Sequence, residues 1–347
     1  MDRLVAAERL SARPDLSANL EPTDRAYLAS CRQAEADAKG RKRRVQALVG
    51  VFIAAIIAGL AAWWKQDWVK ERLYELENVH VLAAAKERVL KPEDSFKECT
   101  DCPEMVVVPA GSFMMGSPAG QGDDDEHPQH NVTIAKPFAV SKFELTFEQW
   151  DACVADDGCN RYIPPDHAWG RGRQPAIYVS WDDAQEYVAW LTKLTGRQYR
   201  LLTEAEYEYG ARAGKQTAYP WGDQLGTNNA NCAGCGSKWD GKQPAPVGSF
   251  HPNGFGLYDM VGNVSEWVED CYLGDYSGAP VEGHADYHPP PTDGSAWDDC
   301  GPRPSRDIRG GSWNTSYRNL RSAHRFATVP DYRVSDLGFR VARTVDH

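Results

Sequence analysis

The longest uninterrupted run of apolar side chains extends from Ala47 to Trp64 and contains no charged residue. A helix of this length can cross the hydrocarbon layer of a bilayer, which requires roughly 17–25 predominantly apolar residues. Trp63 and Trp64 close the run, where aromatic side chains commonly anchor a helix at the membrane surface. The pattern therefore predicts a transmembrane helix over residues 45–64.

Charged residues are distributed unevenly on the two sides of this run. Five basic residues lie within residues 39–44, whereas the basic residues of 65–72 are offset by Asp67 and Glu71. The positive-inside rule predicts a cytoplasmic tail over residues 1–44, a single pass through the cell inner membrane and a periplasmic or extracytoplasmic remainder. A cleaved signal peptide is the alternative, but the segment before the apolar run is long for one. An ordinary buried helix fits less well, because the basic block lies on one side only.

Two segments flank the predicted membrane helix. Residues 65–91 are rich in helix-forming side chains and contain no Gly or Pro before Pro92, which predicts a helical stalk over residues 65–92. Its apolar positions are too irregular for a coiled coil. Residues 1–38 are polar and mixed in charge, so a short amphipathic helix and a disordered tail both remain open.

The remaining chain, residues 93–347, alternates short apolar runs with helical periodicity and many turns. Strand-like runs occupy Met105–Pro109 and Phe113–Met115, with a Pro-Ala-Gly turn between them. Three segments begin with a hydroxyl residue followed three positions later by Gln, Asp or Glu, which is the pattern of a helix N-terminal cap. These pairs are Thr146 with Gln149, Ser180 with Asp183 and Thr203 with Glu206. We therefore predict a loop-rich α+β domain.

Composition narrows the class of protein. The chain is 42% hydrophobic and 25% charged, as expected of a globular protein rather than a disordered one. A net charge of −11 argues against nucleic acid as a partner, because phosphate binding requires a basic surface. Twelve Trp and fifteen Tyr favour a loop-rich fold held by aromatic side chains, or an aromatic binding surface.

The cysteines follow the predicted topology. Cys31 precedes the membrane span, and the other eight follow it. An even number in an extracytoplasmic domain predicts disulfides. A zinc site or a thioredoxin-like redox pair is the alternative, but the spacing of the two C-x-x-C pairs differs from that of zinc ribbons and no βαβ pattern surrounds them. The simplest pairing is local: Cys99–Cys102, Cys153–Cys159, Cys232–Cys235 and Cys271–Cys300.

Two stretches carry side chains that bind cations. The loop 116–130 is acidic around residues 123–126 and contains His127 and His130, which we interpret as a solvated loop or a weak cation site. In Asn253–Trp267, glycines alternate with apolar residues, and three side chains carry oxygen atoms of the kind that Ca²⁺ takes as ligands. A capped turn with solvated acids is the alternative for Asp259, Asn263 and Glu266.

Seven motifs occur together in a distinctive order. They are Met105–Gly116, Pro175–Trp181, Arg200–Tyr207, Tyr219–Gly222, the Gly-Asn-x-x-Glu-Trp motif ending at Trp267, Arg309–Trp313 (RGGSW) with Leu320–Ala323, and Leu337–Arg340 (LGFR). From about Glu104 to Arg343 the chain resembles the formylglycine-generating enzyme, or sulfatase-modifying factor, domain family. The resemblance implies the family's variant of the C-type lectin fold, preceded here by the membrane helix and stalk.

The resemblance does not extend to the family's catalytic cysteines. Members of the family oxidise a substrate cysteine with a copper ion held by two cysteines shortly after RGGSW. Here the segment from Trp313 to Arg321 contains no cysteine, and none follows Cys300. Because Cu(I) requires soft thiolate ligands, no copper is expected and cysteine oxidation is not predicted. An oxidase that uses non-haem iron is the alternative, and His324 with Asp331 and Asp336 are the nearest candidate ligands.

The resemblance implies one or two structural Ca²⁺ ions. Matched onto this chain, the first site would use the side chains of Asp259 and Glu266 and the carbonyl oxygens of Gly262 and Val264. A second site would use Asn231 and Asp240 with backbone oxygens near Cys232. Such ions would order loops that lack regular hydrogen bonding.

The segment after Trp313 forms the floor of the ligand cleft in this fold. Its framework motifs are intact, and the residues between them resemble the variable segment of C-type-lectin-fold proteins diversified by retroelements. That set contains no Lys, Glu, Gln, Met or Trp, and consists of Asn314–Tyr317, His324, Phe326–Val329, Tyr332 and Val334–Asp336. An ordinary loop surface is the alternative, and a near-identical template repeat beside the gene would decide between them.

Function is predicted from this segment. We expect a membrane-anchored module that binds a protein or small-molecule ligand outside the cytoplasm. An enzyme of the same family that modifies a protein substrate is the alternative, and a structural subunit of an envelope complex is a third. Aromatic and Arg side chains carry much of the energy of binding interfaces. The expected ligand contacts are Trp313, Asn314, Tyr317, Arg318, His324, Arg325, Phe326 and Tyr332.

Overall fold

The structure is a computed structural model that describes residues 5, 8–9, 11–17, 21–277, 289–298, 300 and 305–345. It divides into two compact units, Met1–Tyr74 and Glu75–His347. Each unit is described separately below.

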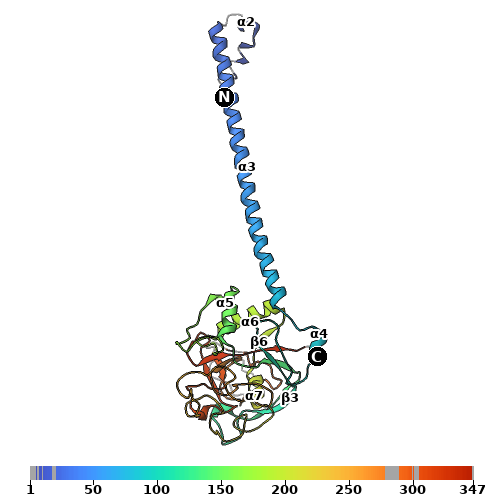
Figure 1. Ribbon diagram of the computed structural model, residues 1–347, viewed down its shortest axis with the longest axis vertical. Coiled ribbons are helices and arrows are strands. Elements are labelled where there is room, and N and C mark those ends of the chain that lie inside the picture. Colours follow the sequence, from blue (N-terminus) through green and yellow to red (C-terminus); the bar gives the residue numbers. More distant parts are fainter. Residues whose placement is uncertain are drawn as a thin grey trace. The chain divides into compact units, whose positions relative to one another are not determined.

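The first unit is built around one long helix. Helix α2 covers Pro14–Ser17, and helix α3 runs without a break from Pro22 to Asn78 (Figure 1). Its part from Pro22 to Lys65 contains the apolar run, whose side chains are exposed along the helix. Within the described residues, this helix is long and apolar enough to span a membrane, as the hydrophobic pattern predicts. The segment 1–38, for which helix and disordered tail were both open, is helical from Pro22 onward.

The predicted stalk helix is too long at its C-terminal end. α3 ends at Asn78 rather than near Pro92, and only the short helix α4, Ala84–Glu87, follows. The backbone instead turns so that the His80 amide donates to the Glu98 carbonyl over 2.7 Å, and Val79 is paired with Cys99 in an isolated bridge. Tertiary contacts override the helix propensity of this segment, because Val79, Leu82 and Leu90 pack against the core of the second unit.

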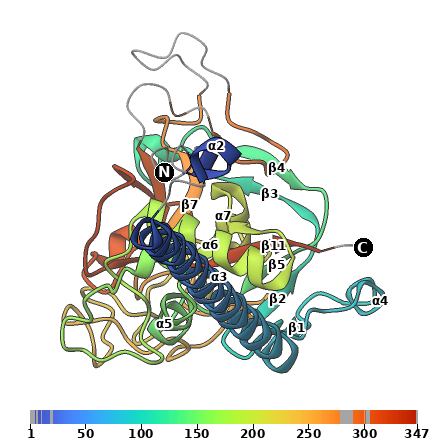
Figure 2. The same cartoon turned by 90° about the horizontal axis from the view of Figure 1, so that it is seen from above.

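The main sheet of the second unit is antiparallel and has five strands. Strand β11 is the last strand that the structure describes and lies between β5 and β6, so the C-terminal segment is an inner strand of the sheet, where Ala342 opposes Val140 on one side and Arg200 on the other. Figure 2 shows β2, β5 and β11 side by side. In spatial order the strands are β1 (Ser95–Phe96), β2 (Met105–Val108), β5 (Phe138–Ser141), β11 (Val341–Thr344) and β6 (Tyr199–Leu201).

A second sheet contains the Glu-Trp end of the Gly-Asn-x-x-Glu-Trp motif, the first residue of RGGSW and most of the LGFR motif. Its strands β7 and β10 are parallel, and the other pairs are antiparallel. Strand β9 lies at one edge of the sheet as described. The spatial order is β10 (Leu337–Phe339), β7 (Ser265–Cys271), β8 (Arg306–Arg309) and β9 (Arg325–Thr328); a separate two-stranded sheet pairs β3 (Gly111–Met115) with β4 (His130–Ile134).

The three predicted helix starts are confirmed. Helices α5 (Phe147–Ala155), α6 (Trp181–Thr195) and α7 (Glu204–Arg212) each begin directly after the expected hydroxyl residue. In each case the hydroxyl accepts a bond from the backbone amide three residues on, and that residue's side chain bonds back to the cap. The 3-10 turns are η1 (Asp124–Glu126), η2 (Cys159–Arg161) and η3 (Tyr317–Asn319).

Aromatic side chains and disulfides hold the loops between these elements. Trp150 stacks on Tyr187, and both rings meet Phe339 edge-on in the core, with centroids 5.7–6.4 Å apart. All four predicted disulfides are present, namely Cys99–Cys102, Cys153–Cys159, Cys232–Cys235 and Cys271–Cys300, and Cys31 is free. The mixed helix and sheet content confirms the α+β prediction, while the finer assignment to a C-type-lectin-like fold stays a prediction.

Candidate ligand-binding segment and its buried support

The RGGSW motif fixes the start of the C-terminal segment through two glycines. Gly310 and Gly311 have φ of 89° and 68°, a conformation that residues with a Cβ rarely adopt. A Cβ on Gly310 would lie 2.5 Å from the Tyr207 hydroxyl oxygen, so a larger residue would also clash. Ser312 follows, and its hydroxyl donates to Asp336 Oδ2 over 2.9 Å. This hydrogen bond joins the first residues of the C-terminal segment to Asp336, near its other end, below the exposed residues between them.

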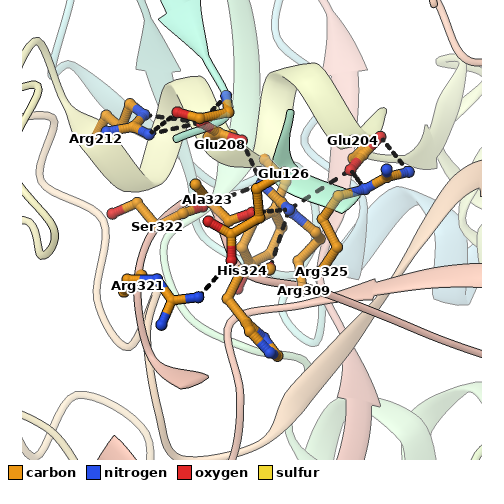
Figure 3. Close-up of polar contacts among 12 residues, drawn as sticks. Glu126, Glu204, Glu208, Arg212, Arg309, Arg321, Ser322, Ala323, His324 and Arg325 are labelled. Atoms are coloured by element: carbon orange, nitrogen blue, oxygen red, sulfur yellow. Dashed lines mark hydrogen bonds and ion pairs between the residues drawn. The ribbon is translucent and has the colours of Figure 1, made fainter. Parts of the chain in front are cut away.

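Arg309 supports the turn that follows from inside the domain. Its guanidinium is fully buried and donates to the carbonyl oxygens of Ser322, Ala323 and His324 over 2.9–3.0 Å. The same group forms an ion pair with Glu208 on α7 (Figure 3). Burial acts to lower the pKa of Arg309, but the surrounding carboxylates outweigh it and raise that pKa above its usual range. One charged side chain therefore sets the backbone of residues 322–324.

Arg325 belongs to the same interior network. It forms an ion pair with Glu204 on α7 (Figure 3). A second ion pair joins it to Asp307 on β8 over 2.8 Å, and its own side chain is fully buried. Its guanidinium also lies over the Tyr276 ring, 4.4 Å from the centroid. Arg325 is predicted from the sequence to be a ligand contact, but this prediction is wrong, because its guanidinium pairs with the two buried acids Glu204 and Asp307 in the core.

Trp313 is also an interior residue. Its ring is 8% exposed, meets Trp169 edge-on at 5.4 Å, and its Nε1 donates to the Ser335 carbonyl over 3.3 Å. Like Arg325, it supports the segment rather than presenting itself to solvent. The sequence does not distinguish Trp313 and Arg325 from their exposed neighbours, because Trp and Arg are also enriched among the residues that carry binding energy in interfaces.

A polar cluster at the surface joins the acidic loop to the C-terminal turn. Arg321 forms an ion pair with Glu126 (Figure 3). It also donates to Asp123 Oδ2 over 3.0 Å, and the other carboxylate oxygen of Glu126 accepts from the Ser117 hydroxyl. His324 Nε2 lies 3.7 Å from the same Asp123 oxygen. Burial lowers the pKa of His324, so the ring is neutral at neutral pH.

From its sequence, the acidic loop 116–130 is predicted to be solvated or to form a weak cation site. In the structure the positive charge next to this loop comes from the protein itself, because the Arg321 guanidinium contacts both Asp123 and Glu126, and Glu126 is fully buried. The acidic run signals a charge partner, but only the fold shows that the partner lies in the C-terminal segment. His127 and His130 bond to the carbonyl oxygens of Gln121 and Pro128.

The remaining predicted contacts are exposed. Tyr317 is 38%, Tyr332 44% and Phe326 61% exposed, and Asn314 and Arg318 are also exposed. Tyr317 belongs to η3, where its carbonyl accepts a bond from the Tyr219 hydroxyl over 3.2 Å. Phe326 lies on the edge strand β9. We call Asn314, Tyr317, Arg318, Phe326 and Tyr332 the exposed C-terminal residues.

The side chains predicted to hold the first Ca²⁺ ion lie in the interior. Both oxygens of Glu266 accept bonds from Arg340, over 2.7 and 2.8 Å. Asp259 Oδ2 accepts from the Gly248 amide over 2.7 Å, and burial raises the pKa of Asp259 to about 6. Glu144, which sequence reasoning missed, joins them: burial first, and then the nearby Asp259 and Glu266, raise its pKa well above the usual range.

These residues do not form a ready donor set for a metal. Three buried carboxyl groups face one arginine, an excess of negative charge that favours a cation. Both Glu266 oxygens, however, are committed to Arg340, and no three His, Cys, Asp or Glu side chains within the described ranges come together as metal ligands. No signal in the sequence indicates that Glu144 is buried here. Calcium at Asp259, Gly262, Val264 and Glu266 stays a prediction.

The residues predicted for a second ion order a disulfide loop. The Asp240 carboxylate accepts from the amides of Gly234 and Gly236 over 2.7 and 2.6 Å. Asn231 is fully buried, donates to the Gln243 carbonyl and accepts from the Ser237 hydroxyl. The two side chains thus hold the loop around Cys232–Cys235 through separate hydrogen bonds.

The cysteine chemistry of the second unit is fully assigned. All eight of its cysteines form disulfides, and no side chain in the segment from Trp313 to Arg321 carries sulfur. Of the candidate iron ligands, His324 faces Asp123, whereas Asp336 accepts a bond from Ser312. Among the residues that the structure describes, no three such side chains come together, so His324, Asp331 and Asp336 do not form an iron site.

Comparison with known proteins agrees with the fold. A family model described as a sulfatase-modifying factor enzyme 1-like domain matches residues 91–345. The formylglycine-generating enzyme of Thermomonospora curvata is 30% identical, over 69% of this chain and 92% of that protein. The inactive C-alpha-formylglycine-generating enzyme 2 of Mus musculus is also 30% identical, over 69% of this chain and 85% of its own. The structure of PvdO from Pseudomonas aeruginosa is similar, with 40% identity and a TM-score of 0.65, over 74% of this chain and all of that one.

Proposed function

Because the chain belongs to the sulfatase-modifying factor enzyme 1-like family, we propose that its second unit is a ligand- or protein-binding module rather than a cysteine oxidase. One observation carries the proposal: the segment after RGGSW has no cysteine, and every cysteine of the unit forms a disulfide. A Cu(I) centre of the family's type requires two free thiolates. The relatives include one protein named formylglycine-generating enzyme and one named inactive C-alpha-formylglycine-generating enzyme 2, which supports a family scaffold that occurs with and without that activity.

The binding contacts in this proposal are the exposed C-terminal residues. They combine aromatic rings with one Arg, the types that contribute most to interface energy. The backbone between them is held from inside the domain, since Arg309 bonds to the carbonyls of residues 322–324 and Gly310 and Gly311 fix the entry to the segment. A pre-organised surface loses less entropy on binding than a mobile loop. The support is therefore what suits this segment to recognition.

The proposal includes the membrane anchor and calcium. Helix α3 would hold the module at the inner membrane with the second unit outside the cytoplasm, supported by its apolar run and the basic residues before it. One or two Ca²⁺ ions would have a structural role. The surplus of buried carboxyl groups around Arg340 supports the first ion.

Site-specific photocrosslinking in membranes tests the binding role. Benzoylphenylalanine is placed at Phe326, Tyr317 or Tyr332, and at the exposed Lys136 as the control position. We expect the same partner adduct from the three C-terminal positions and none from Lys136. Absence of adducts from all three positions, or identical adducts from Lys136, would contradict the proposal.

An enzyme of the same family is the second candidate. It is favoured by the 38% identity to the formylglycine-generating enzyme of Mus musculus, over 70% of this chain and 75% of that protein. Oxygen consumption with a cysteine-containing peptide tests it. Our proposal predicts no turnover above that of the peptide alone, and turnover in proportion to the protein concentration would favour the enzyme.

A further inference from the structure

A group of basic side chains directly precedes the apolar run of helix α3. Arg41, Lys42, Arg43 and Arg44 are consecutive and exposed, and we call them the basic ring. Helix α3 continues without a break from the basic ring into the apolar run (Figure 1), so helix geometry fixes their separation. At a rise of about 1.5 Å per residue, Arg44 precedes Ala47 by about 4.5 Å and Arg41 precedes it by about 9 Å along the axis.

This separation matches the headgroup layer of a bilayer. A membrane is about 40–45 Å thick with its headgroups and about 30 Å without them, which leaves about 5–8 Å for each polar layer. When the apolar run spans the hydrocarbon core, the basic ring therefore lies at or next to the level of the lipid phosphates. Successive residues are about 100° apart around a helix axis, so the four side chains are distributed on all sides of α3.

The chain provides little negative charge to neutralise the basic ring. Side chains three or four positions apart on a helix can form ion pairs, and Asp37, four residues before Arg41, is the one acid at that spacing. The adjacent Lys39 is itself paired with Glu35 over 2.9 Å. No acid that the structure describes forms an ion pair with any residue of the basic ring. Its positive charge is therefore available to a ligand.

The opposite end of the apolar run is different. Trp63 and Trp64 close it, and the following Lys65 is offset by Asp67 two residues later. Four consecutive basic residues occur only before the run. The excess of positive charge is thus confined to one of the two membrane surfaces that α3 would meet.

From this geometry we infer that the basic ring binds anionic phospholipids, whose phosphate groups contact its Lys and Arg side chains. A guanidinium can donate two parallel N–H···O bonds to one phosphate. Each basic residue near an anionic membrane surface strengthens the attraction about fivefold. Lipid headgroups fit better than a protein partner, because they can surround the helix on every side at this depth. The inference rests on the membrane anchor of the proposed function and names the lipid class that the anchor prefers.

Native mass spectrometry of the full-length chain in detergent tests the inference. The chain is titrated with phosphatidylglycerol, which is anionic, and with phosphatidylcholine of the same acyl chains, which has no net charge. We expect phosphatidylglycerol to bind at least about fivefold more tightly. Equal affinities for the two lipids would contradict the inference, and tight binding of an RNA oligonucleotide in their place would assign the basic ring to nucleic acid.

Two double variants separate the basic ring from a general effect of charge. Arg43→Gln with Arg44→Gln should weaken phosphatidylglycerol binding at least about fivefold and leave phosphatidylcholine binding unchanged. Lys65→Gln with Lys70→Gln removes the same charge from the other side of the apolar run and should leave both affinities unchanged. The measurement in detergent does not depend on which way the chain is inserted. Equal weakening in the two double variants, or none in the first, would overturn the inference.

Extraction of membranes with alkaline carbonate distinguishes a failure of this inference from a failure of the proposed anchor. We expect the chain to stay in the membrane fraction and, once purified, to prefer phosphatidylglycerol. A chain that carbonate releases is not an integral membrane protein, and the proposed anchor would then fail together with the inference. A chain that stays in the membrane but binds both lipids equally would contradict the inference alone.

Discussion

At the scale of single residues, buried ion pairs determine where the candidate binding segment lies. The single guanidinium of Arg309 contacts both Glu208 on α7 and the three carbonyl oxygens of the surface turn 322–324. Removing one member of such a buried set leaves an uncompensated charge, which costs far more than an exposed ion pair contributes. The position of the surface turn therefore depends on side chains that no ligand touches.

Arg309→Lys tests this dependence. A lysine ammonium is a single point of charge and cannot reach three carbonyls and a carboxylate in one plane. We expect a loss of about 3 kcal/mol in the free energy of unfolding, measured in urea. Arg318→Lys is the matched control, because Arg318 is exposed, and it should leave the stability unchanged. A stable Arg309→Lys variant would show that the network does not hold the turn.

Asp270 makes the stability of the domain depend on pH, and the direction of this dependence can be predicted. Burial, followed by the neighbouring Glu204, raises the pKa of Asp270 to about 7, whereas an unfolded chain would ionise it near 3.8. Between these values the folded state binds more protons than the unfolded state, so stability falls as pH rises and levels off above about 7. The carboxyl oxygens accept from the amides of Glu204 and Trp297.

The prediction is tested by urea unfolding of the wild type and Asp270→Asn at pH 5 and pH 8. The wild type should lose more free energy of unfolding between these pH values than the variant, which cannot ionise at this position. Equal losses would mean that the pKa of Asp270 is not raised in the folded state.

At the scale of secondary-structure elements, features set by residues a few positions apart can be predicted from the sequence, whereas features set by residues far apart in the chain cannot. The three capping boxes could be predicted because cap and partner lie three residues apart. The end of α3 could not, since it depends on the His80 amide meeting Glu98 and on Glu87 pairing with Arg343, far along the chain. The order of the strands could not be predicted from the sequence either, because β11 lies between β5 and β6 although it is far from both in the chain.

The two threonine caps should differ in strength. Thr146 acts only as a cap, whereas the Thr203 hydroxyl also donates to the Gly294 carbonyl over 2.9 Å. Thr146→Ala should cost about 1 kcal/mol, as expected for an N-cap, and Thr203→Ala should cost more because the Gly294 carbonyl also loses its partner. Thermal and urea unfolding of both variants provides the comparison, and equal losses would contradict it.

At the scale of the whole molecule, the sequence indicated the family and the disulfides but not which site residues are accessible. The motifs of a family are defined by residue type and spacing, which the chain shows directly. Exposure is a property of the packed domain, so Tyr317 and Phe326 could not be distinguished from the buried Trp313 and Arg325 beforehand. The same holds for Glu144, whose position beside Asp259 and Glu266 appears only in the fold.

The metal content of the purified full-length chain tests the central claim most directly. The protein is incubated with Cu(I) under conditions that leave the disulfides intact, washed with a chelator and analysed by elemental analysis, alongside a calcium titration. Our account predicts no stoichiometric copper, and calcium at one or two ions per chain with a higher melting temperature. One tightly held copper ion per chain, together with oxygen consumption on a cysteine-containing peptide, would contradict the account and identify an oxidase.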